Sequence, residues 1–126
     1  MPLTIDLAGQ VVLVTGGTQG IGLGITRTFV EAGAAVVTCA RSEIAAPEPG
    51  TSHVRCDVRD PESVQAAVDE VVARHGRLDV AVNNAGGAPY ALAADASPRF
   101  HEKVLGLNLA GPLAVAQAAN RVMQAQ

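Results

Sequence analysis

A glycine-rich turn near the start of the chain has residue types and spacing suited to binding a phosphate group. The eight residues 15–22 read TGGTQGIG and lie between an apolar run and a stretch with helical spacing. A pyrophosphate bound there needs backbone amides facing it, a helix N-terminus behind it and no obstructing side chains. We expect Gly16 to permit the turn, Gly20 the close approach and Gly22 the packing of helix on strand. A purely structural turn is the alternative.

An arginine follows the second predicted strand, at the position that distinguishes two nicotinamide dinucleotides. An acid there would bind the adenosine ribose hydroxyls and favour NAD, whereas a cation would meet a 2′-phosphate. This chain has Ala40 followed by Arg41, whose guanidinium can form two hydrogen bonds to phosphate oxygens. The sequence therefore favours NADP over NAD as the cofactor, with a solvated surface arginine as the alternative.

Two further segments follow the third and fourth predicted strands. Asp57 can accept a hydrogen bond from an adenine amino group, with Val58 against the ring; a turn or helix-capping aspartate is the alternative. The small residues in Asn83-Asn84-Ala85-Gly86 would let the chain pass beneath a cofactor, while the amide side chains tie neighbouring strands. Taken alone, that segment is also consistent with an ordinary turn.

The elements that must position these residues alternate along the chain. Continuous or alternating apolar runs predict strands over 11–15, 35–40, 53–56 and 78–82. Helical spacing predicts helices over 21–32, from 60 to about 75, and from 97 nearly to the end, with loops over 41–51 and 83–96. The expected core faces are Ile21, Ile25, Phe29 and Val30 in the first helix, and Val64, Val68, Val71 and Val72 in the second.

Alternating strands and helices predict one α/β domain with a doubly wound parallel sheet of about four strands and helices on both faces. Asp60-Pro61-Glu62 is typical of a helix start, because it supplies a cap oxygen, a first-turn proline and an acid near the positive end of the dipole. Gly76 can end that helix.

Composition narrows the possible classes of protein. Hydrophobic residues make up 48% of the 126 residues, which is enough for a core, and the net charge of −3 disfavours nucleic acid as a partner. No apolar run reaches the roughly 20 residues of a membrane span, so no membrane association is expected. The first residues carry no basic-then-apolar export signal.

The cysteines and histidines suggest structural roles. Cys39 and Cys56 are too few for a secreted disulfide framework, so we expect buried free thiols and a cytoplasmic location. His53, His75 and His101 share no metal-ligand spacing, and we expect no metal site.

Taken together, these segments resemble the short-chain dehydrogenase/reductase family in order and spacing. The resemblance implies a seven-stranded Rossmann-like domain that transfers hydride between a nicotinamide and a carbonyl or hydroxyl carbon of a small molecule. It implies cofactor contacts by Gly16, Thr18, Gln19, Gly20, Ile21, Gly22, Arg41, Asp57, Val58, Asn84, Ala85 and Gly86. Asn108, in Asn108-Leu109-Ala110-Gly111, matches the family's catalytic helix asparagine. In the family, the carbonyl of this asparagine holds a water; Pro112, which lacks an N–H, would leave it free or simply kink the helix.

The other catalytic residues of the family have no counterpart in the chain. Tyr90 has Ala94 four residues on, and Lys103 has no tyrosine four residues before it, so neither belongs to a Tyr-x-x-x-Lys pair. We therefore expect residues 1–126 to be the amino-terminal part of one NAD(P)-binding domain, catalytically incomplete alone and part of a homodimer or homotetramer at full length. A non-catalytic dinucleotide-binding module and a truncated fragment are the alternatives.

Overall fold

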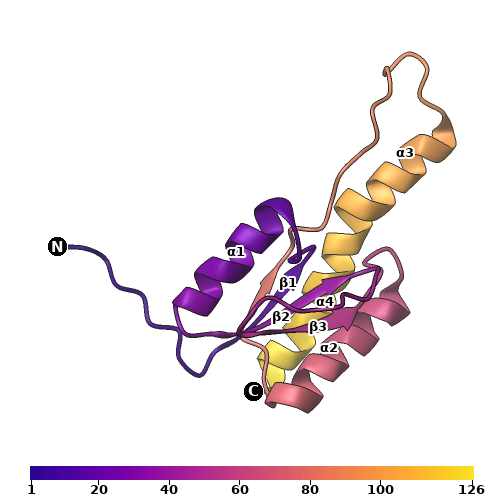
Figure 1. Ribbon diagram of the computed structural model, residues 1–126. Helices are drawn as coiled ribbons and strands as arrows, with labels where there is room; N and C mark the ends of the chain where they lie inside the picture. The colour runs from indigo at the N-terminus through magenta and orange to yellow at the C-terminus, as the bar shows by residue number, and fades with distance from the viewer.

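The computed structural model describes residues 1–126 as one parallel four-stranded sheet flanked by helices (Figure 1). Its strands lie in the order β3-β2-β1-β4. The elements in chain order are β1 (Val11–Thr15), α1 (Gly20–Glu31), β2 (Ala35–Ala40), β3 (Thr51–Arg55), α2 (Pro61–His75), β4 (Val80–Val82), α3 (Pro98–Leu105), the π-helical turn η1 (Gly106–Ala110) and α4 (Gly111–Ala125). None of the helices combines the length and hydropathy needed to cross a lipid bilayer.

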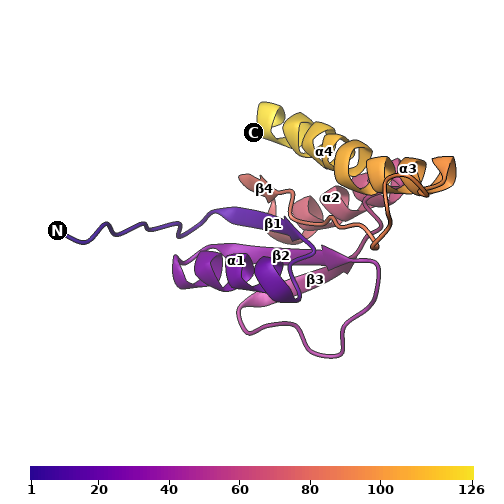
Figure 2. The same cartoon turned by 90° about the horizontal axis from the view of Figure 1, so that it is seen from above.

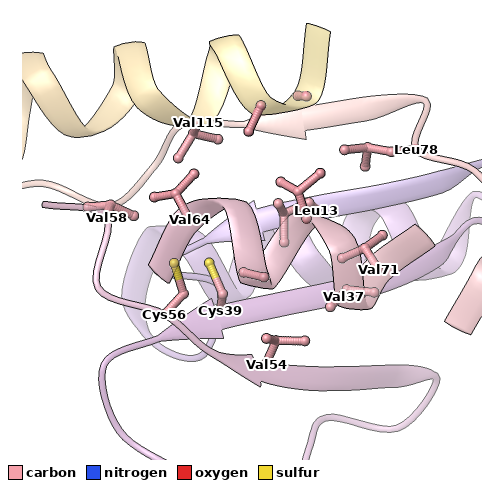
Figure 3. Close-up of a cluster of buried hydrophobic side chains, with 14 of the residues drawn as sticks. Leu13, Val37, Cys39, Val54, Cys56, Val58, Val64, Val71, Leu78 and Val115 are labelled. Carbon is pink, nitrogen blue, oxygen red and sulfur yellow. The ribbon is translucent and has the colours of Figure 1, made fainter. Parts of the chain in front are cut away.

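Both faces of the sheet are covered, which confirms the doubly wound α/β architecture. Figure 2 shows α1 on one side of the sheet, with α2 and α4 on the other. Because side chains alternate along a strand, Val11 and Leu13 of β1 join a large cluster with α2 and α4. Val12 and Val14 join a smaller cluster with α1. Figure 3 shows the larger cluster, in which Leu13 and Val37 of the sheet face Val71 of α2.

The start and the end of α2 follow the sequence prediction. The Asp60 carboxylate accepts a hydrogen bond from the Glu62 N–H at 3.0 Å, and Pro61 opens the helix. Gly76 ends it in the left-handed conformation, with φ of 77°, and donates its N–H to the Val72 carbonyl. The predicted face is buried at Val64, Val68 and Val71 and half-buried at Val72.

Several predicted boundaries and one core residue were wrong. Strand β3 starts at Thr51, whose hydroxyl donates to the Glu48 carbonyl at 2.6 Å, and ends at Arg55. Strand β4 starts at Val80, directly after Asp79, whose carboxylate accepts the Val11 N–H at 2.8 Å. Ile21 is 81% exposed and does not join the core face of α1, although Ile25, Phe29 and Val30 pack on the smaller cluster.

The predicted final helix is interrupted in its middle. At η1 the Gly111 N–H donates to the Gly106 carbonyl, five residues earlier instead of four. A π turn adds one residue to a helical turn, which accommodates Pro112 at the start of α4 without breaking the helix. Pro112 therefore lies in the first turn of α4, just after a local change of helical pitch.

Candidate functional site

A cavity of about 210 Å³ opens where the carboxyl ends of the strands meet. The neighbours of β1 are β2 on one side and β4 on the other, so the chain reverses its winding direction here. In open parallel sheets such a crevice is the usual ligand site. Six predicted cofactor residues line it: Gly16, Arg41, Asp57, Val58, Ala85 and Gly86. Folding therefore brings together residues that lie up to 70 positions apart in the chain.

The turn between β1 and α1 is packed too tightly for most side chains. Gly16 and Gly20 adopt positive φ angles of 65° and 55°. A Cβ added at Gly22 would lie 2.0 Å from the Gly16 carbonyl oxygen, and one at Gly16 would lie 3.0 Å from Asn84 Nδ2. Around Gly20 there is open space, so its conformation rather than its neighbours requires glycine. The structural roles of Gly16 and Gly22 in turn and packing agree with prediction.

The amino end of α1 has no partner from the protein's side chains. Its N-cap residue is Gln19, whose side chain makes no capping hydrogen bond, and the first turn contains no acidic residue. The free amides and the helix dipole leave partial positive charge at this end. The exposed Ile21 lies in this turn, whereas Thr18 lines a separate pocket of about 100 Å³ beside the loop that follows β2. An anion is the ligand that this helix end can hold.

Thr15 fastens the end of β1 to the segment that follows β4. Its buried hydroxyl donates to the Val82 carbonyl at 3.2 Å and accepts the N–H groups of Asn84 and Ala85 at 3.1 and 2.9 Å. In return, Asn84 Nδ2 donates to the carbonyls of Thr15 and Gly16, each at 3.1 Å. The predicted amide tie between neighbouring strands is confirmed for Asn84, whereas the Asn83 side chain bonds to the start of α4. Sequence reasoning missed the role of Thr15, although a hydroxyl ending a buried apolar strand must find a partner.

Asn108 holds the backbone beside the cavity. Its Oδ1 accepts the Gly87 N–H at 2.9 Å, and its Nδ2 donates to the carbonyls of Gly87 and Val104 at 2.7 and 2.9 Å. A Cβ at Gly86 would come within 2.8 Å of Asn108 Oδ1. Asn83 Nδ2 makes a parallel link to the Pro112 carbonyl at 3.2 Å. The helix containing η1 is thus joined to the loop that lines the cavity.

The Asp57 side chain is held in a turn by hydrogen bonds from Arg59. Its Oδ1 accepts the Arg59 backbone N–H at 3.0 Å and Arg59 Nε at 2.9 Å, and its Oδ2 accepts Arg59 Nη2 at 2.8 Å. Hydrogen bonding to Arg59 lowers the pKa of Asp57 to about 2. This geometry supports the turn aspartate that the sequence left as an alternative. Arg41, by contrast, takes part in none of the four ion pairs of the structure.

The two cysteines lie in the wall of the same cavity. Both are buried and free, as predicted. Figure 3 shows their side chains pointing in the same direction from β2 and from the end of β3. The adjacent Cys56 thiol and burial raise the pKa of Cys39. Their structural role is to fill the base of the cavity wall.

Comparisons with known proteins point to one family. Residues 10–126 match the sequence model of the short chain dehydrogenases. The chain is 43% identical over 125 residues to the L-fucose dehydrogenase of Bos taurus, covering 94% of this chain and 46% of the relative. It is 42% identical over 126 residues to the momilactone A synthase of Oryza sativa subsp. japonica, covering 93% and 46%.

Solved structures give the same picture. The aldohexose dehydrogenase of Thermoplasma acidophilum, in ligand-free form, superposes with a TM-score of 0.86 at 29% identity, covering 98% of this chain and 46% of the other. A putative short-chain dehydrogenase from Novosphingobium aromaticivorans superposes with a TM-score of 0.87 at 29% identity, covering 94% and 47%. The chain thus spans about half the length of the proteins that it matches.

Proposed function

The chain belongs to the short-chain dehydrogenase family, and on that premise we propose that it forms the nucleotide-binding part of an NADP-dependent oxidoreductase. The reaction would be hydride transfer between the cofactor and a ketone or secondary alcohol of a small molecule. Relatives named as dehydrogenases of L-fucose, D-threitol and borneol support an alcohol or sugar as the substrate class.

The observation that carries this proposal is the uncapped amino end of α1, behind a turn that needs positive φ at Gly16 and Gly20 and has no room for a Cβ at Gly22. A pyrophosphate would receive hydrogen bonds from the amides of Gln19, Gly20 and Ile21 and would be stabilised by the helix dipole. The neighbouring cavity, with Val58 and Ala85 in its lining, suits an adenine ring. The residues present therefore fit a dinucleotide.

Preference for NADP rests on Arg41. This side chain is exposed, lines the cavity and takes part in no ion pair, so its guanidinium is available to a phosphate. The Asp57 carboxylate keeps lone pairs for an adenine amino group while Arg59 fixes its orientation.

The cofactor, when bound, would supply the carbon that donates or accepts hydride. Asn108, fastened to Gly87 and Val104, would hold the helix backbone in place for a proton relay. The serine, tyrosine and lysine of such a relay would come from outside residues 1–126. We further propose a homodimer or homotetramer as the functional assembly. The two free thiols support the reducing cytoplasm as the compartment.

Replacing Arg41 by aspartate tests the cofactor assignment. In Arg41→Asp a 2′-phosphate loses its cation and meets a negative charge, so affinity for NADPH should fall by about a hundredfold, while NADH binding is retained or improved. Titrations followed by cofactor fluorescence give both values. Arg99→Asp, at an exposed site on α3, is the matched control. Equal affinity for the two cofactors in both the parent and Arg41→Asp would contradict the NADP assignment.

A further inference from the structure

A second cavity adjoins the first and has a different chemical character. It encloses about 480 Å³, and all four lining residues are polar: Arg41, Arg55, Asp57 and Ser63. Arg41 and Asp57 also line the 210 Å³ cavity, so the two hollows share a wall. A ligand whose aromatic base occupies the first cavity could therefore extend a charged group into the second.

The second arginine of this cavity was not identified from the sequence as a site residue. Arg55 is the last residue of β3 and pairs in register with Ala40, the residue before Arg41. Its Nε donates to the Arg41 backbone carbonyl at 2.9 Å. That bond places the backbone of Arg41 beside the guanidinium of Arg55. It leaves the two Nη groups of Arg55 without a partner inside the protein.

A neighbouring contact fixes the loop that carries Arg41. His53 lies two residues before Arg55, so both side chains leave β3 on the same face. His53 Nε2 bonds to the Ser42 carbonyl at 2.9 Å. Two successive carbonyls, of Arg41 and Ser42, are therefore held by side chains from β3. The loop enters the cavity in a defined position before any ligand binds.

The charges in this cavity favour an anion. Asp57 is the one acidic residue in the lining, and its carboxylate is neutralised by Arg59 through both oxygens. Arg41 and Arg55 take part in no ion pair. Two guanidinium groups that face one hollow repel each other, and a doubly charged phosphate between them removes that repulsion.

We propose that Arg41 and Arg55 together form a site for a phosphate monoester, the 2′-phosphate of an adenosine ribose whose base occupies the adjoining cavity. This inference rests on the proposed function, because it takes the first cavity as the adenosine site. It adds Arg55 as a second phosphate ligand and as a residue that determines cofactor specificity. Free inorganic phosphate offers the same chemistry, so the test must separate the two sources.

The test is calorimetric titration of the full-length protein with three probes: adenosine 2′,5′-bisphosphate, adenosine 5′-monophosphate and inorganic phosphate. The parent protein should bind the bisphosphate at least about tenfold more tightly than either other probe. Arg55→Met should weaken bisphosphate binding about tenfold and leave the monophosphate within about twofold, which also shows that the variant is folded. Arg99→Met, with the same loss of charge at an exposed site on α3 that lines neither cavity, should match the parent.

Arg55→Lys separates phosphate binding from a merely structural role. Lysine keeps the charge but cannot reproduce both the bond to the Arg41 carbonyl and a two-pronged phosphate contact. It should restore at least about threefold of the lost affinity and the dependence of binding on salt, which Arg55→Met should flatten. If Arg55→Lys is as weak as Arg55→Met, Arg55 acts only through Arg41 and the phosphate role is overturned.

The remaining outcomes keep the two proposals apart. If Arg55→Met binds the bisphosphate like the parent, the second-ligand inference fails and the assignment of NADP through Arg41 stands. If the parent does not distinguish the bisphosphate from the monophosphate, the NADP assignment fails and this inference fails with it. If inorganic phosphate binds as tightly as the bisphosphate, the cavity is a free-anion site and the inference is also overturned.

Discussion

The helices α1 and α2 start at the same edge of the sheet in opposite ways. At the start of α2, Asp60 caps the backbone, Pro61 removes one amide that would need a partner, and Glu62 complements the dipole. At the start of α1, Gln19 makes no capping bond and no acid is present in the first turn. A backbone amide in the first turn of α2 finds a partner in the Asp60 side chain, whereas the first amides of α1 are left for an external anion.

The contrast shows that two β–α connections of the same chain can serve different purposes: the start of α2 stabilises its helix, and the start of α1 is open to a ligand. A cap contributes about 1 kcal/mol to stability, and α1 forgoes that contribution. The turn before it is instead held by side chains: Asn84 Nδ2 donates to the carbonyls of Thr15 and Gly16, and the Thr15 hydroxyl accepts the Ala85 N–H. These contacts hold the turn, and no protein side chain caps the helix end behind it.

The largest expected effect comes from adding a methyl group to the α1 turn. Gly22→Ala would place a Cβ 2.0 Å from the Gly16 carbonyl oxygen, so the turn must move. We expect a loss of about 2–3 kcal/mol in the free energy of unfolding, with loss of dinucleotide binding. Denaturant unfolding and NADPH titration measure the two effects.

Gly24→Ala is the matched control for that change. Gly24 lies on the same helix, and a Cβ there meets nothing within 4 Å. Alanine should stabilise the helix by about 0.5–1 kcal/mol and leave binding unchanged. Equal behaviour of the two variants would show that close packing at Gly22 does not shape the turn.

An acidic cap at the start of α1, like the one on α2, should weaken dinucleotide binding and raise the stability of the protein. In Gln19→Asp the new carboxylate would cap the free amides and repel a pyrophosphate. We expect affinity for NADPH to fall at least about tenfold, while the protein without ligand gains about 0.5–1 kcal/mol. Thermal melting with and without NADPH reports both changes. Unchanged affinity would place the phosphates elsewhere.

The reverse change removes the cap of α2. Asp60→Ala should cost about 1 kcal/mol in the free energy of unfolding, because the Glu62 amide loses its acceptor. Dinucleotide affinity should stay within about twofold of the parent, since this helix end lies outside the proposed pyrophosphate site. A large loss of affinity in a stably folded variant would remove the functional distinction between the two helix starts.

The smallest effect concerns Asp57 and acid. Its pKa is lowered to about 2 in the folded chain, mainly by Arg59, against a usual value near 3.9. The ionised form therefore stabilises the fold above about pH 4, and this contribution is lost as the pH falls towards 2. Asp57→Asn should lose less stability than the parent between pH 4 and 2, by an amount that solvent screening keeps small. Urea unfolding across that range is the measurement, and parallel curves would contradict it.

The sequence predicted the elements that depend on local chemistry. β1 and β2 agree residue for residue because each is a short run of mainly apolar residues, and α2 agrees because Asp60-Pro61 and Gly76 mark its ends. The cavity residues that follow the strands were also anticipated, because parallel strands bring their carboxyl ends to one edge.

What could not be predicted depends on tertiary contacts. Ile21 is apolar and lies at helical spacing, which predicts burial, yet its side chain is exposed. The position of Arg55 beside Arg41 follows from the register of β2 and β3, which a single sequence does not specify. Before the shortened β4, both backbone groups of Leu78 bond to the side chain of Gln126, 48 positions along the chain.

The π turn at η1 also limits how the length of this segment can change during evolution. Each helical residue advances the direction of the side chains by about 100°. A π turn absorbs one extra residue, so deleting a residue there would restore a regular turn while the flanking helices keep their relative direction. The same deletion within α4, before Val115, has no such turn to absorb it: either Asn108 would leave Gly87, or Val115 and Ala119 would leave the core. Homologous chains should therefore tolerate a gap of one residue at η1 more readily than elsewhere in this helix.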